Sequence, residues 1–117
     1  MDADVLFAAI AVSDFERGRA WYERFFGRNP DVVAHAAEVM WRVTDTGWLY
    51  ILRDAANAGH GIVSIAVPDV EAAASELEAR GVQIGPIKPE GDAGRKVLVR
   101  DPDGNSIAII EVVAPES

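Results

Sequence analysis

Apart from its carboxylates, this chain has few residues that are able to do acid–base or metal chemistry. It has no cysteine and two histidines, His35 and His60, beside 19 acidic residues. Imidazole and carboxylate groups are common ligands of divalent metals. His60, however, lies in the small, polar segment 54–61, which is typical of a solvated loop, and nothing near His35 in the sequence pairs with it. We therefore expect no metal site at either histidine, and no thiol or disulfide chemistry.

Other catalytic arrangements have little support. No histidine lies at a readable spacing from Ser13, Ser64, Ser75 or Ser106, which argues against a Ser-His-Asp triad. Asp101 and Asp103 resemble a carboxylate pair, but their place in the turn sequence Asp-Pro-Asp-Gly-Asn explains both. Arg95 and Arg100 flank a predicted strand and indicate a solvated face, although Arg95 is also placed to contact an anion. The loop 88–94 before it is either a lid or a plain connector.

The composition is that of an acidic protein. The 117 residues carry a formal net charge of −8, and 50% of them are hydrophobic. This charge argues against nucleic acid, whose phosphates require Lys and Arg, and against anionic membrane surfaces. No apolar run approaches the ~20 residues of a membrane span, and the acidic N-terminus lacks the basic region of a signal peptide. We expect a cytoplasmic protein whose charge either serves solubility or attracts a cationic ligand.

An internal repeat organises the chain. The sequence Ile-Ala-Val-Ser-Asp at residues 10–14 recurs as Ile-Ala-Val-Pro-Asp at residues 65–69, and six of the fourteen positions from 10 to 23 are identical at that offset of 55. The offset is nearly half the chain length, which indicates two copies of one structural unit. Two such copies leave a groove between them, and pockets favour such junctions.

Each copy predicts the order strand, helix and three strands. For the first copy we expect a strand at 5–12, a helix capped by Ser13 or Asp14 and ended by Gly27, and strands at 31–36, 38–44 and 48–53. For the second we expect a strand at 62–67, a helix at 70–80, and strands at 82–87, 95–100 and 106–113. We thus predict a single domain, 1–117, with unit 1 at about 4–53, a linker at 54–61 and unit 2 at about 62–113.

This order resembles the vicinal oxygen chelate superfamily of glyoxalase I, extradiol dioxygenases, fosfomycin resistance proteins and bleomycin resistance proteins. The resemblance covers essentially the whole chain. The resemblance rests on both Val-x-Asp junctions between strand and helix, on the aromatic segment up to Phe26-Gly27, and on the turn at 101–105. It implies an α+β fold in which two tandem βαβββ units form curved mixed sheets around a groove, with the helices on the outer face.

Enzymes of this superfamily typically bind a divalent metal through a His early in a unit and a Glu or Gln late in it. Carried over by position, these ligands fall on Phe7 and Tyr50 in the first unit and on Ile62 and Ala108 in the second. None of the four is a usual ligand for a divalent metal. We therefore expect no metal, no cofactor and no catalytic residue, and the resemblance is closest to the bleomycin-resistance branch.

Strand alternation predicts the lining of the groove. The set comprises Phe7, Ala9, Trp41, Trp48, Tyr50, Ile62, Ser64, Ala108 and Ile110. Trp41 lies opposite Tyr50 if the hairpin has the two-residue tip 45–46, whereas a three-residue tip places Arg42 there; we favour Trp41. These aromatic residues either line a groove for a flat molecule or simply form core.

Three functions follow as hypotheses. The first is a metal-free small-molecule-binding protein that sequesters a hydrophobic, aromatic or cationic ligand without turnover. For this function, the resemblance to the bleomycin-resistance branch implies a homodimer in which each groove takes one half from each chain. The second is an enzyme: either a glyoxalase- or dioxygenase-like lyase with unusual ligands, or an isomerase that uses Tyr50 as acid or base. The third is a partner-binding module whose groove is filled by its own side chains.

Overall fold

The computed structural model describes residues 1–89, 91–92 and 94–112. The first unit contains β1 (Leu6–Val12), α1 (Phe15–Phe26), β2 (Val32–His35), β3 (Glu38–Arg42) and β4 (Gly47–Arg53). After a 3₁₀ turn at Ala55–Asn57, the second contains β5 (Ile62–Ala66), α2 (Val70–Ala79), β6 (Lys88–Pro89), β7 (Gly94–Arg100) and β8 (Ser106–Val112). The predicted α+β fold of two βαβββ units is confirmed. Within the described ranges, neither helix combines the length and apolar character needed to cross a membrane.

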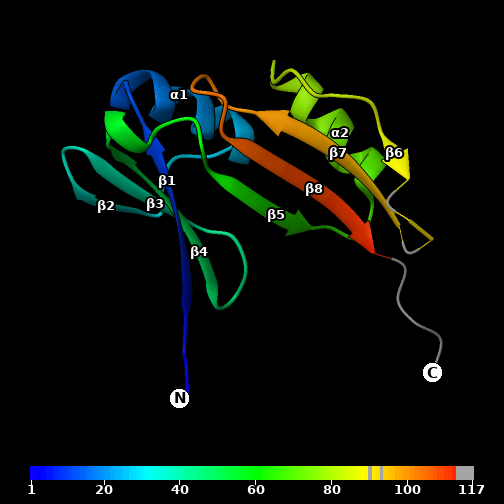
Figure 1. The fold of residues 1–117 in the computed structure, drawn as a ribbon, viewed down its shortest axis with the longest axis horizontal. Coiled ribbons are helices and arrows are strands. Elements are labelled where there is room, and N and C mark those ends of the chain that lie inside the picture. Colours follow the sequence, from blue (N-terminus) through cyan, green and yellow to red (C-terminus); the bar gives the residue numbers. More distant parts are fainter. Residues whose placement is uncertain (90, 93, 113–117) are drawn as a thin grey trace.

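Each unit forms its own four-stranded mixed sheet, and both sheets have the same strand order. β1 pairs in parallel with β4, and antiparallel β3 and β2 follow. In the second unit β5 pairs in parallel with β8, and β7 and β6 follow. The two helices lie together along one side of the molecule, with the strands spread out beneath them (Figure 1). One cluster of buried side chains includes residues from both units, so the units share a hydrophobic core.

The limits of α1 follow from its terminal residues. Asp14, not Ser13, caps the helix: its carboxylate accepts a hydrogen bond from the backbone N–H of Arg17 at 3.1 Å. Gly27 ends the helix with a φ of 72°, in the left-handed region that favours glycine. The Arg80 guanidinium at the end of α2 then donates to the exposed carbonyls of Arg24 and Phe25, at 2.5 and 2.7 Å. The second unit thus supplies hydrogen bonds that the end of α1 lacks.

The strand predicted at residues 82–87 is absent, and only the two-residue strand β6 follows it. The segment nevertheless runs beside β7, where the Gly85 N–H donates to the Leu98 carbonyl at 3.0 Å. Pro86 has no N–H to donate, so a regular ladder cannot continue past it. The prediction was wrong because it weighed the apolar residues of this segment and not its backbone donors.

A buried polar network joins the two copies around Asn105, which has no solvent-exposed surface. Its side-chain oxygen accepts hydrogen bonds from the backbone N–H groups of Gly59, at 3.1 Å, and Gly61, at 2.7 Å. Its side-chain nitrogen donates to the Ala11 carbonyl of β1 at 2.9 Å and to the Asp101 carboxylate at 2.7 Å. One side chain thus holds the linker, the first strand and the last turn together.

The two carboxylates of the turn at 101–105 also reach the first unit. The Tyr22 hydroxyl of α1 donates to Asp101 at 2.7 Å, and both groups are buried. The Asp103 carboxylate accepts from the backbone N–H of Ser13 at 3.0 Å and from the Ser13 hydroxyl. The sequence assigned both aspartates to the turn alone, but each also makes a contact between the units.

Tyr22 makes stability depend on pH in the alkaline range. Burial, and then the charge and hydrogen bond of Asp101, raise the pKa of Tyr22 above its ordinary value. Its contribution is therefore fully present below about pH 10, where a tyrosine of the unfolded chain titrates, and is lost as the pH rises further. We expect the free energy of unfolding to fall by about 1.4 kcal/mol more per pH unit above pH 10 in the wild type than in Tyr22→Phe.

Urea unfolding followed by circular dichroism between pH 8 and pH 11 measures this difference in slope. Tyr50→Phe provides the spectroscopic control, because it leaves Tyr22 as the single tyrosine of the chain. In that variant, tyrosinate absorbance is expected to appear together with unfolding. A tyrosinate signal with a midpoint near pH 10 in a still folded protein would contradict the assignment.

Candidate functional site

The open face of the first sheet carries an aromatic cluster formed by Phe7, Trp48 and Tyr50. The cross-strand register pairs Phe7 with Trp48 and Ala9 with Tyr50, so all four residues share this face. The Phe7 ring lies 6.2 Å from the Trp48 ring and 6.3 Å from the Tyr50 ring, measured between centroids. Phe7 remains 51% exposed. The cluster is therefore a surface that a flat ligand can contact, not a filled core.

Trp41 does not belong to this cluster, and the prediction that it does was wrong. The observed register pairs Trp41 with Leu49, and Met40 with Tyr50. Trp41 is fully buried on the helix side of the sheet, where its ring stacks on Phe26 at 5.1 Å between centroids. Met40 is the neighbour of Tyr50 that the sequence reasoning missed. Neither of the two hairpin tips considered from the sequence would have placed it there.

On the open face of the second sheet, β5 and β8 present mostly apolar side chains and no aromatic ones, whereas Lys96 and Arg100 of β7 add charge to the same face. Ile62 is 84% exposed at the start of β5, and Ser64 pairs with Ala108 across the parallel β5–β8 ladder. Ile110 is the next residue of β8 on this face, because the buried positions of that strand are Ile107 and Ile109. The predicted residues of the second unit thus share one face, with Ser64 as their polar group.

The positions that would hold a metal in related enzymes do not fit one. Phe7 and Tyr50 lie on the first sheet, Ile62 and Ala108 on the second, and none of the four offers a carboxylate or an imidazole. Within the ranges that the structure describes, no three His, Asp or Glu side chains come together as a metal site would require. No step that depends on a divalent metal can therefore be derived from these residues.

The histidines occupy separate places. His60 is exposed in the linker between the units, as its surroundings in the sequence predict. His35 has a neighbour that the sequence reasoning overlooked: its Nε2 lies 3.8 Å from the Glu38 carboxylate. That pair sits on the edge strand β2 and its neighbour β3, with most of the His35 side chain exposed. It makes a surface contact and has no third ligand among the described residues.

The sequence placed Arg95 at the end of a loop, where it could contact an anion. In the structure, two carboxylates of the protein already pair with it. Its guanidinium contacts the Glu71 carboxylate at 2.6 Å and the Glu111 carboxylate at 3.2 Å. The Glu111 carboxylate also accepts a hydrogen bond from the Val70 N–H at the start of α2, at 3.0 Å. These contacts raise the pKa of Arg95, chiefly through the hydrogen bonds that its guanidinium donates to Glu71 and then to Glu111. Arg95 thus fastens β7 and β8 to the start of α2.

Comparison with known proteins assigns the chain to a family. Residues 5–109 match the family described as the Glyoxalase/Bleomycin resistance protein/Dioxygenase superfamily. The chain belongs to this superfamily. A glyoxalase/bleomycin resistance protein from Catenulispora acidiphila DSM 44928 shares 35% sequence identity with it at a TM-score of 0.88, over 94% of this chain and 99% of the other. No curated protein sequence matches the chain.

Two solved structures of lower identity share the superfamily fold with this chain. One is a bleomycin-binding protein in complex with bleomycin, with 19% identity and a TM-score of 0.74 over 95% of this chain and 98% of the other. The other is TnmS3, an antibiotic-binding protein from Streptomyces sp. CB03234, with 21% identity and a TM-score of 0.75 over 95% and 97%. At these identities the likeness shows the fold alone.

Proposed function

We propose that this protein binds a hydrophobic or aromatic small molecule and sequesters it without chemical turnover and without a metal. The observation that carries the proposal is the cluster of Phe7, Trp48 and Tyr50 on the open face, where Phe7 is about half exposed. Two of the three, Phe7 and Tyr50, stand at positions that correspond to metal ligands in related enzymes. Aromatic faces of this kind favour flat partners and, through cation–π contact, also cations. The bleomycin-binding and antibiotic-binding proteins of the same fold are consistent with such a role.

A homodimer is part of this proposal. Large apolar side chains lie exposed on the open faces of both sheets, among them Phe7, Ile62 and Leu98. Large exposed apolar side chains that share one face are typical of an interaction surface. In the proposed dimer, each groove takes the first unit of one chain and the second unit of its partner.

Light scattering at micromolar concentration tests the assembly. We expect twice the chain mass of 12.6 kDa for the wild type. Ile62→Asp introduces a charge on the proposed interface at a side chain that is 84% exposed in the single chain, so the variant is expected to fold and to shift toward the monomer. A wild type that is monomeric at this concentration would contradict the dimer.

Fluorescence titration tests the binding function. Trp21 and Trp41 are buried, so a ligand on the open face is expected to quench chiefly Trp48. With N-phenyl-1-naphthylamine, a neutral aromatic probe, we expect saturable quenching and an affinity loss of about tenfold or more in Phe7→Ala, equivalent to about 1.4 kcal/mol. Val33→Ala removes a comparably exposed apolar side chain from the opposite face of the same sheet and is the matched control.

The enzymatic alternatives are tested on the same preparation. Dicarbonyl–thiol adducts and catechols are offered with and without Ni²⁺, Zn²⁺, Mn²⁺ and Fe²⁺, and the recovered compounds are analysed by mass spectrometry. We expect every compound to be recovered unchanged. Metal-stimulated turnover would contradict the metal-free role, and turnover without metal that Tyr50→Phe abolishes would assign acid–base chemistry to Tyr50.

A further inference from the structure

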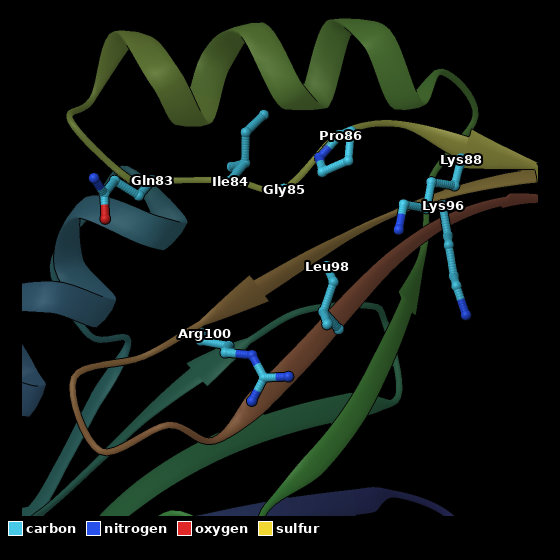
Figure 2. Close-up of a pocket in the computed structure, with 8 residues that line it drawn as sticks. All are labelled: Gln83, Ile84, Gly85, Pro86, Lys88, Lys96, Leu98 and Arg100. Atoms are coloured by element: carbon cyan, nitrogen blue, oxygen red, sulfur yellow. The ribbon is translucent and has the colours of Figure 1, made fainter.

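A hollow lies on the second unit, between β7 and the segment that precedes β6. Its volume is about 390 Å³. Pro86 and Leu98 give it apolar walls, the segment 83–85 closes one side, and three cationic side chains, Lys88, Lys96 and Arg100, complete the lining. Figure 2 shows the segment with Ile84 and Pro86 on one side of the space and the side chains of β7 on the other. The combination is an apolar pocket with a positive rim.

The cations gather here because of strand alternation. Lys96, Leu98 and Arg100 are alternate residues of β7 and therefore share one face of the strand. Lys88 of β6 pairs directly with Lys96 across the antiparallel ladder. The antiparallel pairing therefore brings two ammonium groups to the same end of the pocket.

The positive charge of the pocket lining contrasts with the negative net charge of the whole chain. The chain has a net charge of −8 and only two lysines, and both of them line this pocket. None of the described residues that line it is acidic. Lys96 takes part in a further interaction, whereas neither Lys88 nor Arg100 forms an ion pair within the described part of the chain. Arg95, on the same strand, shows the opposite pattern, since two carboxylates neutralise it.

From this arrangement we infer that the pocket binds the anionic group of an organic ligand, a carboxylate, sulfonate or phosphate carried on a compact apolar body. The Arg100 guanidinium offers the paired donors that such groups accept, and Lys88 adds a point charge. The inference rests on the proposed small-molecule binding and narrows its ligand class. Among aromatic ligands, the pocket favours those that carry an anionic group over those that carry a cationic one. In the proposed dimer, one ligand would hold its ring on the aromatic cluster of one chain and its anionic group in the positive pocket of the other.

A matched pair of probes tests the inference. 8-Anilino-1-naphthalenesulfonate and N-phenyl-1-naphthylamine have the same rings and differ in the sulfonate. We expect the wild type to bind the sulfonate about tenfold more tightly or better, as a charge-assisted hydrogen bond allows. Lys88→Gln/Arg100→Gln is expected to remove this preference while leaving the affinity for the neutral probe within about twofold. Arg17→Gln, an exposed cation on α1, is the control for loss of charge and is expected to retain the preference.

The outcomes separate this inference from the proposed function. If the neutral probe binds through Phe7 but the sulfonate binds no more tightly, the anion site is wrong and the proposed function stands. If the sulfonate depends on Lys88 and Arg100 but Phe7→Ala affects neither probe, the anion site stands and the aromatic cluster is not the binding surface. If neither probe binds, both the anion site and the proposed function are wrong. Unchanged thermal midpoints of the variants show that their folds are intact.

Discussion

Replacing Asn105 with alanine is expected to lower the free energy of unfolding by roughly 3–5 kcal/mol, a large fraction of the stability of a domain of this size. The substitution removes four hydrogen bonds made by one buried side chain. It leaves two backbone N–H groups, a backbone carbonyl and part of the Asp101 carboxylate without their partner. Each unsatisfied buried group costs about 1–3 kcal/mol, and partial access of water to the new space keeps the total below the simple sum.

Asn57→Ala is the matched control for Asn105→Ala. Asn57 is exposed in the linker and its side chain makes a single hydrogen bond, to Asp54 at 2.7 Å. We expect a change of no more than about 0.5 kcal/mol. Urea unfolding followed by far-ultraviolet circular dichroism measures both variants. Similar midpoints for the two would show that the contact between the units at Asn105 is not a main source of stability.

The two tryptophans predicted for the groove are expected to behave in opposite ways. Trp41→Ala removes a fully buried ring and should lower the free energy of unfolding by roughly 3–5 kcal/mol. It also removes the hydrogen bond from the Trp41 indole N–H to the Arg28 carbonyl, at 3.1 Å. Trp48→Ala should cost about 1 kcal/mol or less, because its ring lies on the open face, but it should weaken binding of an aromatic probe.

Unfolding and binding are therefore measured on the same two variants. The neutral naphthylamine probe, followed by its own emission, reports binding without depending on Trp48. We expect Trp48→Ala to lose about tenfold in affinity and Trp41→Ala, at a temperature where it is folded, to retain the wild-type affinity. A loss of affinity in folded Trp41→Ala would show that Trp41 does contribute to the binding site.

Most of the fold was predictable because the signals that specify it are local. The repeat at residues 10–14 and 65–69 predicted two units, and the alternation of side chains predicted which residues of β1, β4, β5 and β8 share a face. Turn residues marked the ends of elements, as Gly27 does for α1. These signals need no knowledge of distant contacts.

The placement of Trp41 failed on the geometry of a single turn. The sequence favoured residues 45–46 as the tip of the hairpin, but the Val43 N–H already donates to the Gly47 carbonyl at 2.9 Å. Gly47 therefore belongs to β4, and the tip is displaced toward the N-terminus. A shift of one residue moves a side chain to the other face of a sheet, which exchanged Trp41 for Met40 beside Tyr50.

The interactions between the units could not be read from the sequence, because they join residues far apart in the chain. Asn105 and Ala11 are 94 positions apart, and Tyr22 and Asp101 are 79 apart. Each of these residues has an adequate local explanation as a strand, helix or turn residue. The positive pocket had a local signal in the alternation of Lys96, Leu98 and Arg100, but its other wall comes from the segment that was predicted as a strand.

The network around Asn105 shows that the two copies of the ancestral unit have become unequal. The strand registers place Gly47 of the first copy where the second copy has Asn105. A chain rebuilt from two first copies would therefore carry glycine at both sites and have no side chain to tie the halves together. A chain rebuilt from two second copies would carry asparagine at both, but Thr44 already lies 2.6 Å from where a Cβ at residue 47 would stand. The two units can therefore no longer replace each other, because Asn105 of the second unit makes contacts that Gly47 of the first cannot make.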